Sequence, residues 1–279
     1  MSNVWLVTGC SSGFGRAIAQ AVIARGDTLV ATARDPASLA ELQSQAPDRV
    51  SALQLDVTDA PQIRQVVGEA ASRHGRVDVL VNNAGRGLIG ATEELTPEQI
   101  AQNFDVNFFG ALNLMREVLP LMRAQKSGWI VNISAAAAIA NYAGFSIYGA
   151  AKAALECASE AIALEGAPFG VKLTLVQPGP FRTDFASRSM TSQPVSAPEY
   201  GATVGKFAAL LASMRGKQPG DPDAAARAIV ALRDEAQPPL RFVLGKYAIG
   251  KARKVAAARQ AELDAWESRG QGTEFAPAR

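Results

Sequence analysis

Tyr148 and Lys152 are the two side chains of this sequence whose types and spacing best suit acid–base chemistry. They stand in Tyr-Gly-Ala-Ala-Lys, at the head of residues 148–166, where apolar and small residues recur at helical spacing. On a helix, positions i and i+4 share one face, so the phenol and the ammonium group would be neighbours. At about 4 Å and an effective dielectric of about 20, their attraction is roughly 4 kcal/mol before desolvation, which would lower the tyrosine pKa by up to about three units. We therefore expect Tyr148 to exchange a proton near neutral pH, although the pair alone also fits a plain surface turn.

A glycine-rich turn near the N-terminus has the form of a pyrophosphate-binding loop. Residues 4–7 are a short apolar run, residues 8–15 read Thr-Gly-Cys-Ser-Ser-Gly-Phe-Gly, and residues 16–25 have a helical pattern. Glycines between a strand and a helix let the backbone approach a pyrophosphate, whose charge meets the free N–H groups of the helix N-terminus. Glycine spacing alone also fits an ordinary tight turn, but the flanking strand and helix favour nucleotide binding.

The same residues match the Gly-x-Ser-x-Gly nucleophile elbow of hydrolases, through Gly9, Ser11 and Gly13. Only one strand precedes the motif, so no upstream loop is available to supply an oxyanion hole. The single histidine, His74, is the only candidate base and lies in a stretch typical of a solvated helix end. We therefore reject the hydrolase interpretation.

The end of the second predicted strand, residues 27–33, indicates which dinucleotide would bind. An acid at this position binds the 2′-hydroxyl of the adenosine ribose, whereas an arginine accommodates a 2′-phosphate. Here Ala33 and Arg34 favour NADP(H) over NAD(H), although Asp35 follows directly. A surface salt bridge is the alternative role for Arg34.

The rest of the chain alternates strands with helices. Apolar runs predict further strands at 50–55, 77–81, 128–134, 171–176 and 240–244, and helical patterns are found at 36–45, 59–72, 96–123 and 246–268. The helix at 96–123 should be interrupted near 107–110, and Pro120 should bend or end it. This alternation predicts one α/β domain over residues 1–279, a Rossmann-type doubly wound parallel sheet of about seven strands with helices on both faces.

Residues 183–220 break the alternation. The segment 183–198 is rich in Ser, Thr and Pro and has no periodicity, which in a compact domain is typical of a functional lid. We expect a loop and helix that cover the substrate. The tail at 270–279 should be flexible.

Composition excludes several functional classes. With a net charge of +2 and 19% charged residues, the 279-residue chain offers no broad attraction to nucleic acid or to an anionic membrane. Cys10 and Cys157 are far apart, and a single histidine excludes multi-histidine zinc centres, so we expect no metal. The N-terminus has neither a basic region nor a long apolar span, which predicts a cytoplasmic protein.

In their order along the chain, the motifs resemble those of the short-chain dehydrogenase/reductase family over residues 3–245. The matching motifs are Thr8-Gly9-x3-Gly13-x-Gly15, Asn82-Asn83-Ala84-Gly85, Asn107, Tyr148-x3-Lys152 and Pro178-Gly179. With Arg34, the sequence looks most like NADP-preferring carbonyl reductases and some hydroxysteroid and retinol dehydrogenases. The resemblance implies reversible hydride transfer between a nicotinamide and a ketone or secondary alcohol.

The resemblance also implies roles for individual residues. Tyr148 would be the general acid and base, Lys152 would bind the nicotinamide ribose, and Asn107 would hold a water molecule that links Lys152 to solvent. The implied cofactor contacts, besides Tyr148 and Lys152, are Gly9, Ser11, Ser12, Gly13, Phe14, Gly15, Arg34, Asp56, Val57, Asn83, Ala84, Gly85, Pro178, Gly179, Phe181 and Thr183. Family members usually form dimers or tetramers, here a homodimer or homotetramer through the helices at 97–123 and 148–166.

The sequence departs from the family at Ala135. The family has a serine thirteen residues before the tyrosine, where its hydroxyl bonds the substrate oxygen. Ser134 lies one residue earlier, and in a regular strand a slip of one residue points a side chain to the opposite face. A bulge presenting Ser134, replacement by Ser146, and a missing donor all remain open, with Ser134 retained as the candidate.

The predicted substrate is a small molecule, a hydrophobic ketone or secondary alcohol. Apolar side chains cluster after the motifs, namely Leu88, Ile139, Tyr142, Phe145, Phe181 and Phe185, although core packing explains each of them equally well. Arg86 could receive an anionic substrate group or be a solvated surface residue. The alternative function, suggested by Ala135, is an NADP(H)-binding sensor or scaffold with a weakened active site.

Restoring the missing hydroxyl tests the departure. Because a single donor of this kind contributes about 10²- to 10³-fold in rate, we expect Ala135→Ser to raise the turnover of carbonyl substrates. Steady-state rates on a ketone panel measure the effect. Unchanged or lower rates on every accepted ketone would contradict a missing donor.

Overall fold

The computed structural model describes residues 2–275 and contains a seven-stranded parallel sheet. The strands are β1 (Val4–Val7), β2 (Thr28–Ala33), β3 (Val50–Gln54), β4 (Val79–Asn82), β6 (Gly128–Ile133), β7 (Val171–Pro178) and β9 (Arg241–Leu244). Their order in the sheet is β3-β2-β1-β4-β6-β7-β9, so the chain winds outward from β1 in one direction and then, from β4, in the other. The reversal lies between β1 and β4, and ligands of doubly wound sheets bind at this switch point.

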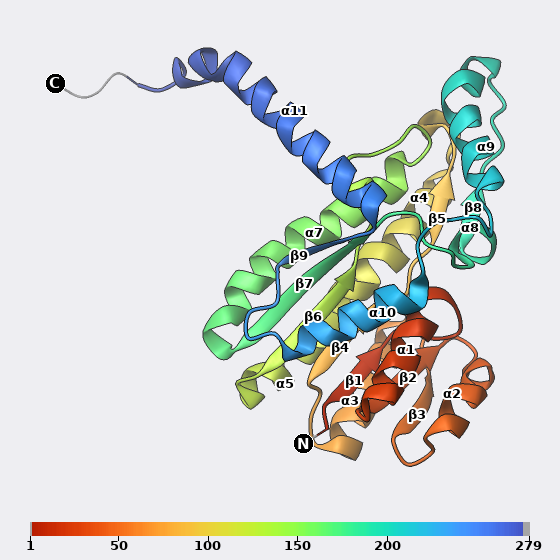
Figure 1. Ribbon diagram of the computed structural model, residues 1–279, viewed down its shortest axis with the longest axis vertical. Coiled ribbons are helices and arrows are strands. Elements are labelled where there is room, and N and C mark those ends of the chain that lie inside the picture. Colours follow the sequence, from red (N-terminus) through yellow and green to blue (C-terminus); the bar gives the residue numbers. More distant parts are fainter. Residues whose placement is uncertain (1, 276–279) are drawn as a thin grey trace.

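Helices cover both faces of the sheet (Figure 1). On one face α1 (Gly13–Arg25), α2 (Ala40–Gln45) and α10 (Pro222–Ala231) pack on one core, and on the other α3 (Ala60–His74), α5 (Gly110–Gln125) and α7 (Ser146–Gly166) pack on a second. Strand alternation divides the side chains between the two cores: Trp5 and Val7 belong to the first, and Leu6 belongs to the second. The predicted fold class is confirmed.

Most predicted elements are present, with boundaries that differ by a few residues. The predicted helix 36–45 is a 3-10 turn, Pro36–Leu39, followed by α2. The predicted helix 96–123 is α4 (Pro97–Phe104), a π-helical turn Asp105–Phe109 and α5, so the interruption falls at Asn107 as expected. Pro120 does not end the helix, which continues to Gln125.

The segment 183–198 has more structure than predicted. It contains α8 (Phe185–Arg188) and β8 (Met190–Ser192), and β8 pairs in parallel with β5 (Gly87–Ile89) in a separate two-stranded sheet. Three-residue strands are too short to give a period in the sequence, which is why both were missed. A further helix, α9 (Lys206–Ser213), follows in the same region.

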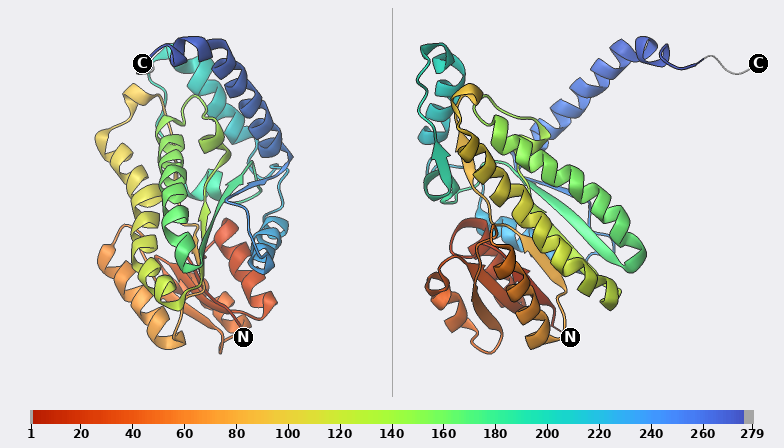
Figure 2. Two further views of the ribbon diagram at one scale, coloured as in Figure 1. Left: turned by 90° about the vertical axis from the view of Figure 1, so that its left-hand side faces the viewer. Right: turned by 180° about the vertical axis from the view of Figure 1, so that it is seen from behind.

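The last helix, α11 (Lys246–Gln271), is three residues longer than predicted and extends away from the sheet (Figure 2). Of the predicted tail, residues 276–279 lie outside the described part of the chain. Within residues 2–275, no helix combines the length and the apolar character needed to span a membrane.

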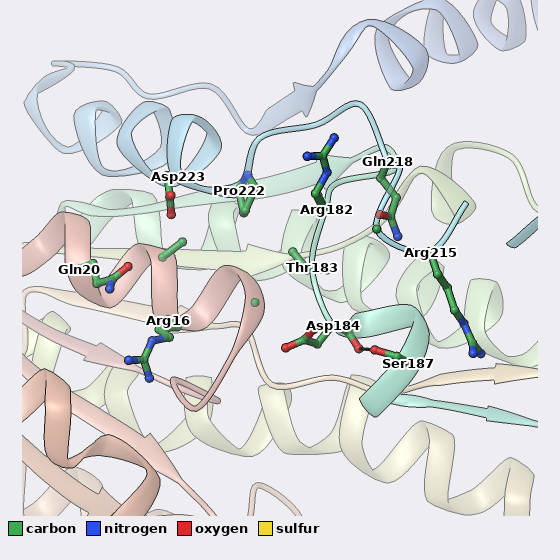
Figure 3. Close-up of a pocket in the computed structure, with 13 residues that line it drawn as sticks. Arg16, Gln20, Arg182, Thr183, Asp184, Ser187, Arg215, Gln218, Pro222 and Asp223 are labelled. Atoms are coloured by element: carbon green, nitrogen blue, oxygen red, sulfur yellow. Dashed lines mark hydrogen bonds between the residues drawn. The ribbon is translucent and has the colours of Figure 1, made fainter. Parts of the chain in front are cut away.

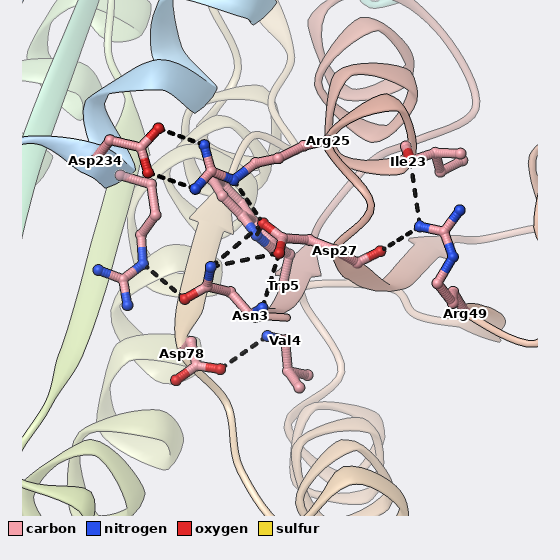
Figure 4. A network of polar contacts seen from close by, with 10 residues as sticks. Asn3, Val4, Trp5, Ile23, Arg25, Asp27, Arg49, Asp78 and Asp234 are labelled. Carbon is pink, nitrogen blue, oxygen red and sulfur yellow. Dashed lines mark hydrogen bonds and ion pairs between the residues drawn. The ribbon is translucent and has the colours of Figure 1, made fainter. Parts of the chain in front are cut away.

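A polar network joins the elements at the amino ends of β1 and β2 (Figure 4). The buried carboxylate of Asp27 accepts hydrogen bonds from the Asn3 backbone N–H at 2.8 Å, from Trp5 Nε1 at 2.9 Å and from Arg25 Nε at 2.9 Å. Arg25 also binds Asp234, whose side chain is 63% exposed. The network therefore ties β1, α1 and the segment after α10 together through one buried charge.

Removing that charge should destabilise the fold. Asp27→Ala leaves the Trp5 N–H and the Arg25 guanidinium without their buried partner, and we expect the free energy of unfolding to fall by about 3 kcal/mol. Asp234→Ala is the matched control, because an exposed partner of the same arginine should cost less than about 1 kcal/mol. Urea unfolding followed by circular dichroism measures both, and equal losses would refute the assignment.

Candidate active site

One cavity of about 940 Å³ opens at the carboxyl ends of β1, β4, β6 and β7. Of the predicted site residues it is lined by Gly9, Ser11, Ser12, Gly13, Phe14, Arg34, Asp56, Val57, Asn83, Ala84, Gly85, Ser134, Tyr148, Lys152, Pro178, Gly179, Phe181 and Thr183. Two predicted residues, Gly15 and Asn107, are not part of its wall. The structure therefore brings nearly the whole predicted set to one place, and the other two lie behind it.

The glycine turn presents the start of α1 to this cavity. Ser12 is the N-cap residue, but no side chain caps the helix and its first turn has no acid. The free N–H groups and the positive end of the helix dipole are thus available to an anion. Gly9 and Gly13 have φ values of +71° and +57°, a conformation that disfavours any other residue.

Gly15 explains how closely the turn is packed. A Cβ at Gly15 would lie 2.2 Å from the Gly9 carbonyl oxygen and 2.4 Å from Asn83 Nδ2. Asn83 donates from Nδ2 to the Thr8 carbonyl at 2.8 Å and to that of Gly9 at 3.2 Å. Asn82 instead donates to Asn132 Oδ1 at 2.8 Å, below the site. Asn83 thus braces the glycine turn as well as lining the cavity.

The end of β2 carries a cation toward the cavity. Arg34 lines the wall, and within residues 2–275 it forms no ion pair. The Asp35 carboxylate accepts a hydrogen bond from the Ala37 N–H at 3.0 Å and caps the turn that begins at Pro36. The acid that followed Arg34 in the sequence is therefore engaged by the backbone.

Tyr148 and Lys152 are both buried on α7, with 6% and 4% of their surfaces exposed. The Tyr148 ring packs against Phe145 and Phe185, with ring centroids 5.1 and 5.7 Å away. Burial raises the pKa of Tyr148 above its ordinary value, the opposite of the direction expected from Lys152 alone. The expectation of a lowered tyrosine pKa is wrong for the cofactor-free chain, because burial removes water from the phenol and disfavours its charged form.

Lys152 donates from Nζ to the Ile133 carbonyl oxygen at 2.8 Å. Burial lowers the pKa of Lys152 to about 8, and the negative charge of Glu156 opposes this change. Asn107 lies behind the wall: its Nδ2 donates to the Arg86 carbonyl at 2.7 Å and to that of Asn103 at 2.9 Å. Its Oδ1 and Lys152 Nζ both lie within 3.5 Å of the point that a Cβ on Gly85 would occupy.

Ser134 does not offer its hydroxyl to the cavity. Its backbone N–H donates to the Val176 carbonyl at 2.8 Å, which continues the pairing of β6 with β7, so there is no bulge. Its hydroxyl donates to Glu156 Oε1 at 2.5 Å. The candidate role of Ser134 as substrate donor therefore disagrees with the contacts, since the slip of one residue turns the side chain to the other face.

The other replacement considered, Ser146, accepts a hydrogen bond from Thr92 Oγ1 at 2.9 Å and is not part of the cavity wall. Ala135 itself lines the cavity. Of the three possibilities, the missing donor fits the structure best.

Part of the cavity wall is apolar. Four of the predicted apolar residues line it, Tyr142, Phe145, Phe181 and Phe185, whereas Leu88 and Ile139 are not in its wall. The large apolar side chains that sequence reasoning missed include Met190, Phe207, Leu210, Leu211, Met214 and Tyr247. They come from β8, from α9 and the residue after it, and from the start of α11, where no motif marked them.

The Arg86 side chain is hydrogen-bonded to β8 and to α4. Its guanidinium donates to Thr191 Oγ1 on β8 at 2.8 Å and to Gln102 Oε1 at 3.2 Å. The cation thus lines the cavity while it links the segment after β4 to β8.

A second cavity of about 270 Å³ lies between α1 and residues 182–187 and 215–223 (Figure 3). Arg16, Arg182 and Arg215 border it but point in different directions, and Arg16 pairs with Glu41. Charges that diverge do not form an anion site. Among the described residues, no group of three or more His, Cys, Asp or Glu side chains is arranged to hold a metal ion.

Known proteins resemble this chain closely. The family model described as short chain dehydrogenase matches residues 3–194. Oxidoreductase BOA17 of Botryotinia fuckeliana is 38% identical over 267 residues, which are 95% of this chain and 97% of that protein. The 3-ketodihydrosphingosine reductase of Bacteroides thetaiotaomicron is 42% identical over 193 residues, 68% of either chain. A solved short-chain dehydrogenase from Streptomyces avermitilis has a TM-score of 0.92 and 45% identity and covers 98% of both chains.

A side chain at Gly15 should force the glycine turn away from Asn83. Because a methyl group on Gly15 would collide with the Gly9 backbone, we expect Gly15→Ala to weaken NADPH binding by at least about 10-fold, or about 1.4 kcal/mol. Gly68→Ala on α3 is the matched control, since nothing lies within 4 Å of its added Cβ. Fluorescence titration measures both, and an unchanged affinity of Gly15→Ala would contradict the close approach.

Proposed function

The chain belongs to the short chain dehydrogenase family, a family of oxidoreductases that use nicotinamide cofactors, and from this premise we propose that it transfers hydride between NADP(H) and a hydrophobic ketone or secondary alcohol. The observation that carries the proposal is one cavity whose wall contains the glycine turn, Tyr148 and Lys152, and a group of large apolar side chains. A dinucleotide and a hydrophobic substrate would meet at the phenol.

The residues present fit a nicotinamide dinucleotide. The start of α1 has no side-chain cap, so its N–H groups are available to a pyrophosphate. Gly15 has no side chain that would disturb the packing of the turn. Lys152 would bind the nicotinamide ribose, and Thr183 with the backbone at Pro178 and Gly179 would hold the carboxamide. When bound, the cofactor supplies or accepts the hydride.

Tyr148 is the proposed general acid and base. Its raised pKa keeps the phenol protonated at neutral pH, so Oη can give its proton to a carbonyl oxygen during reduction. In the reverse direction the phenolate takes the proton of the alcohol. The ammonium group of Lys152 stabilises the phenolate in either direction. With Ala135 in place of a serine, Tyr148 would bind the substrate oxygen without the usual second donor.

Arg34 supports NADP(H) as the preferred cofactor. It lines the cavity at the end of β2, and the neighbouring acid, Asp35, is occupied by the Ala37 N–H. A guanidinium without an ion pair among residues 2–275 matches a 2′-phosphate at this point, and one oxygen of the neighbouring carboxylate is already hydrogen-bonded.

The apolar wall supports a lipid-like or otherwise bulky hydrophobic substrate. Aromatic and aliphatic side chains from α7, α9 and α11 line part of the cavity. One relative is named for the reduction of a ketone, 3-ketodihydrosphingosine. A ketone on a hydrophobic chain is therefore the substrate class that we propose.

We propose that the chain acts as a homodimer or homotetramer. Large apolar side chains are exposed on or near the helices expected at the interface, namely Phe109, Leu164 and Phe169. Such side chains gain from burial against a second copy.

The second candidate function is an NADP(H)-binding sensor or scaffold, favoured by Ala135 alone. Such a protein would bind the cofactor in the same site but would not turn over carbonyl compounds. The absence of the serine would then be the cause of its inactivity.

Arg34→Ala tests the cofactor assignment. Losing a charge-assisted bond to the 2′-phosphate should weaken NADPH by about 10- to 100-fold. NADH, which has no 2′-phosphate, should change by less than about 3-fold. Dissociation constants for both cofactors measure the difference, and Arg64→Ala on the exposed side of α3 is the control. Equal losses for NADPH and NADH would refute the assignment.

Tyr148→Phe tests the reaction. Removal of the phenol oxygen should lower turnover by at least about 10²-fold and leave NADPH binding nearly intact. NADPH oxidation on a panel of hydrophobic ketones measures the rate at neutral pH. Tight NADPH binding without turnover of any ketone by the unaltered protein would favour the sensor instead.

A further inference from the structure

Glu156 lies one helical turn beyond Lys152 on α7, and nothing in the reaction described so far uses it. Tyr148, Lys152 and Glu156 are spaced by four residues and therefore share one face of the helix. Glu156 is 92% buried, because 8% of its surface is exposed. A carboxylate that deep is costly unless it is paired and hydrogen-bonded.

Residues on or next to three neighbouring strands, β6, β7 and β9, surround the carboxylate of Glu156. Ser134 donates to Oε1 at 2.5 Å from the end of β6, and Gln177 on β7 donates from Nε2 to both oxygens at 2.9 Å. Arg241 on β9 brings its Nε to 3.8 Å from Oε2. Ser134 and Gln177 donate hydrogen bonds to the two oxygens, and Arg241 adds a positive charge at longer range, so the surroundings of Glu156 stabilise a negative charge.

The charge of this carboxylate acts on Lys152. The ammonium group is buried, and its hydrogen bond goes to a neutral carbonyl, that of Ile133. Burial lowers the pKa of Lys152, and the Coulomb attraction of Glu156 raises it again. The other titratable groups around Lys152 and Glu156 are the neutral phenol of Tyr148 and the guanidinium of Arg241. Arg241 lies on β9, two strands from β6, and pairs with both Glu156 and Glu160.

We propose that Glu156 is a positioning residue of this site: its buried carboxylate is the counter-charge that keeps Lys152 an ammonium ion, and Ser134 serves that carboxylate rather than the substrate. The proposal rests on the proposed function for its kinetic consequence, since Lys152 supports the phenolate of Tyr148. The support that Lys152 gives to the phenolate matters more in this chain, because Ala135 leaves the substrate oxygen without a second donor.

Loss of the Glu156 charge should lower the pKa of Lys152. An ammonium group that loses its counter-charge gives up its proton at lower pH. A neutral Lys152 no longer stabilises the phenolate, so the alkaline limit of turnover moves to lower pH as well. The proposed catalytic groups remain in place, and only their working pH range narrows.

The direct test is a titration of Lys152 in the full-length, cofactor-free protein. With lysine labelled by ¹³C at Cε, the Lys152 signal is the one missing from Lys152→Met. We expect its midpoint near pH 8 in the unaltered protein and about one unit lower in Glu156→Gln. Glu160→Gln is the matched control: it removes the same charge from the same helix and from the same arginine, but its side chain is 48% exposed, so the midpoint should stay.

An equal midpoint in Glu156→Gln and in the unaltered protein would overturn the proposal, as would an equal shift in Glu160→Gln. If Glu156→Gln does not fold, Arg241→Gln carries the test, because that side chain is 41% exposed. Removing its charge strengthens the field of Glu156 on Lys152, so the midpoint should rise. An unchanged or lower midpoint would overturn the proposal.

Steady-state kinetics distinguish the role of Glu156 from the proposed hydride-transfer reaction. In an active enzyme, Glu156→Gln should lower the alkaline limit of the pH–rate profile by about the same unit, and Ser134→Ala should leave the rate at neutral pH within about 10-fold. A loss of 10²-fold or more in Ser134→Ala would return Ser134 to the substrate. If no ketone is turned over, the proposed function fails while the titration still decides the role of Glu156.

Discussion

The close packing of the glycine turn against the end of β4 is the constraint on which the rest of the site depends. The turn approaches Asn83 so closely that Gly15 has no space for a side chain, and the amide of Asn83 bonds back to the turn at Thr8 and Gly9. This contact spans the reversal of the sheet, between β1 and β4. The contact therefore fixes the N-terminus of α1 relative to the end of β4, where the cavity opens.

Burial sets the electrostatics of the second half of the site. The phenol of Tyr148 is held neutral and the ammonium of Lys152 is made more acidic by the same loss of water. A single buried carboxylate opposes the second change, and hydrogen bonds from Ser134 and Gln177 together with the charge of Arg241 stabilise it. The acid–base pair therefore cannot be understood from α7 alone.

The sequence was sufficient for features that repeat or that carry glycine. The period of the strands, the glycine turn and the i, i+4 pair predicted the sheet, the pyrophosphate loop and the Tyr148–Lys152 pair, because local spacing decides all three. The remaining predicted residues of the cavity wall followed from the family resemblance. It was insufficient where tertiary burial decides. A glutamate within a helix is ordinarily a solvated residue, so Glu156 gave no signal, and the pKa of Tyr148 was predicted in the wrong direction because its desolvation comes from Phe145 and Phe185. The parity of side chains along a strand did anticipate the orientation of Ser134.

The small sheet formed by β5 and β8 has a consequence for ligand binding. Pairing of β8 with Gly87, Leu88 and Ile89 divides the segment 183–198, which borders the cavity, into two shorter spans, and Arg86 adds a hydrogen bond to Thr191 on β8. Much of the conformational entropy of that segment is therefore lost in the free chain. A preorganised cover loses less entropy when a ligand binds beneath it, so more of the contact energy remains as affinity.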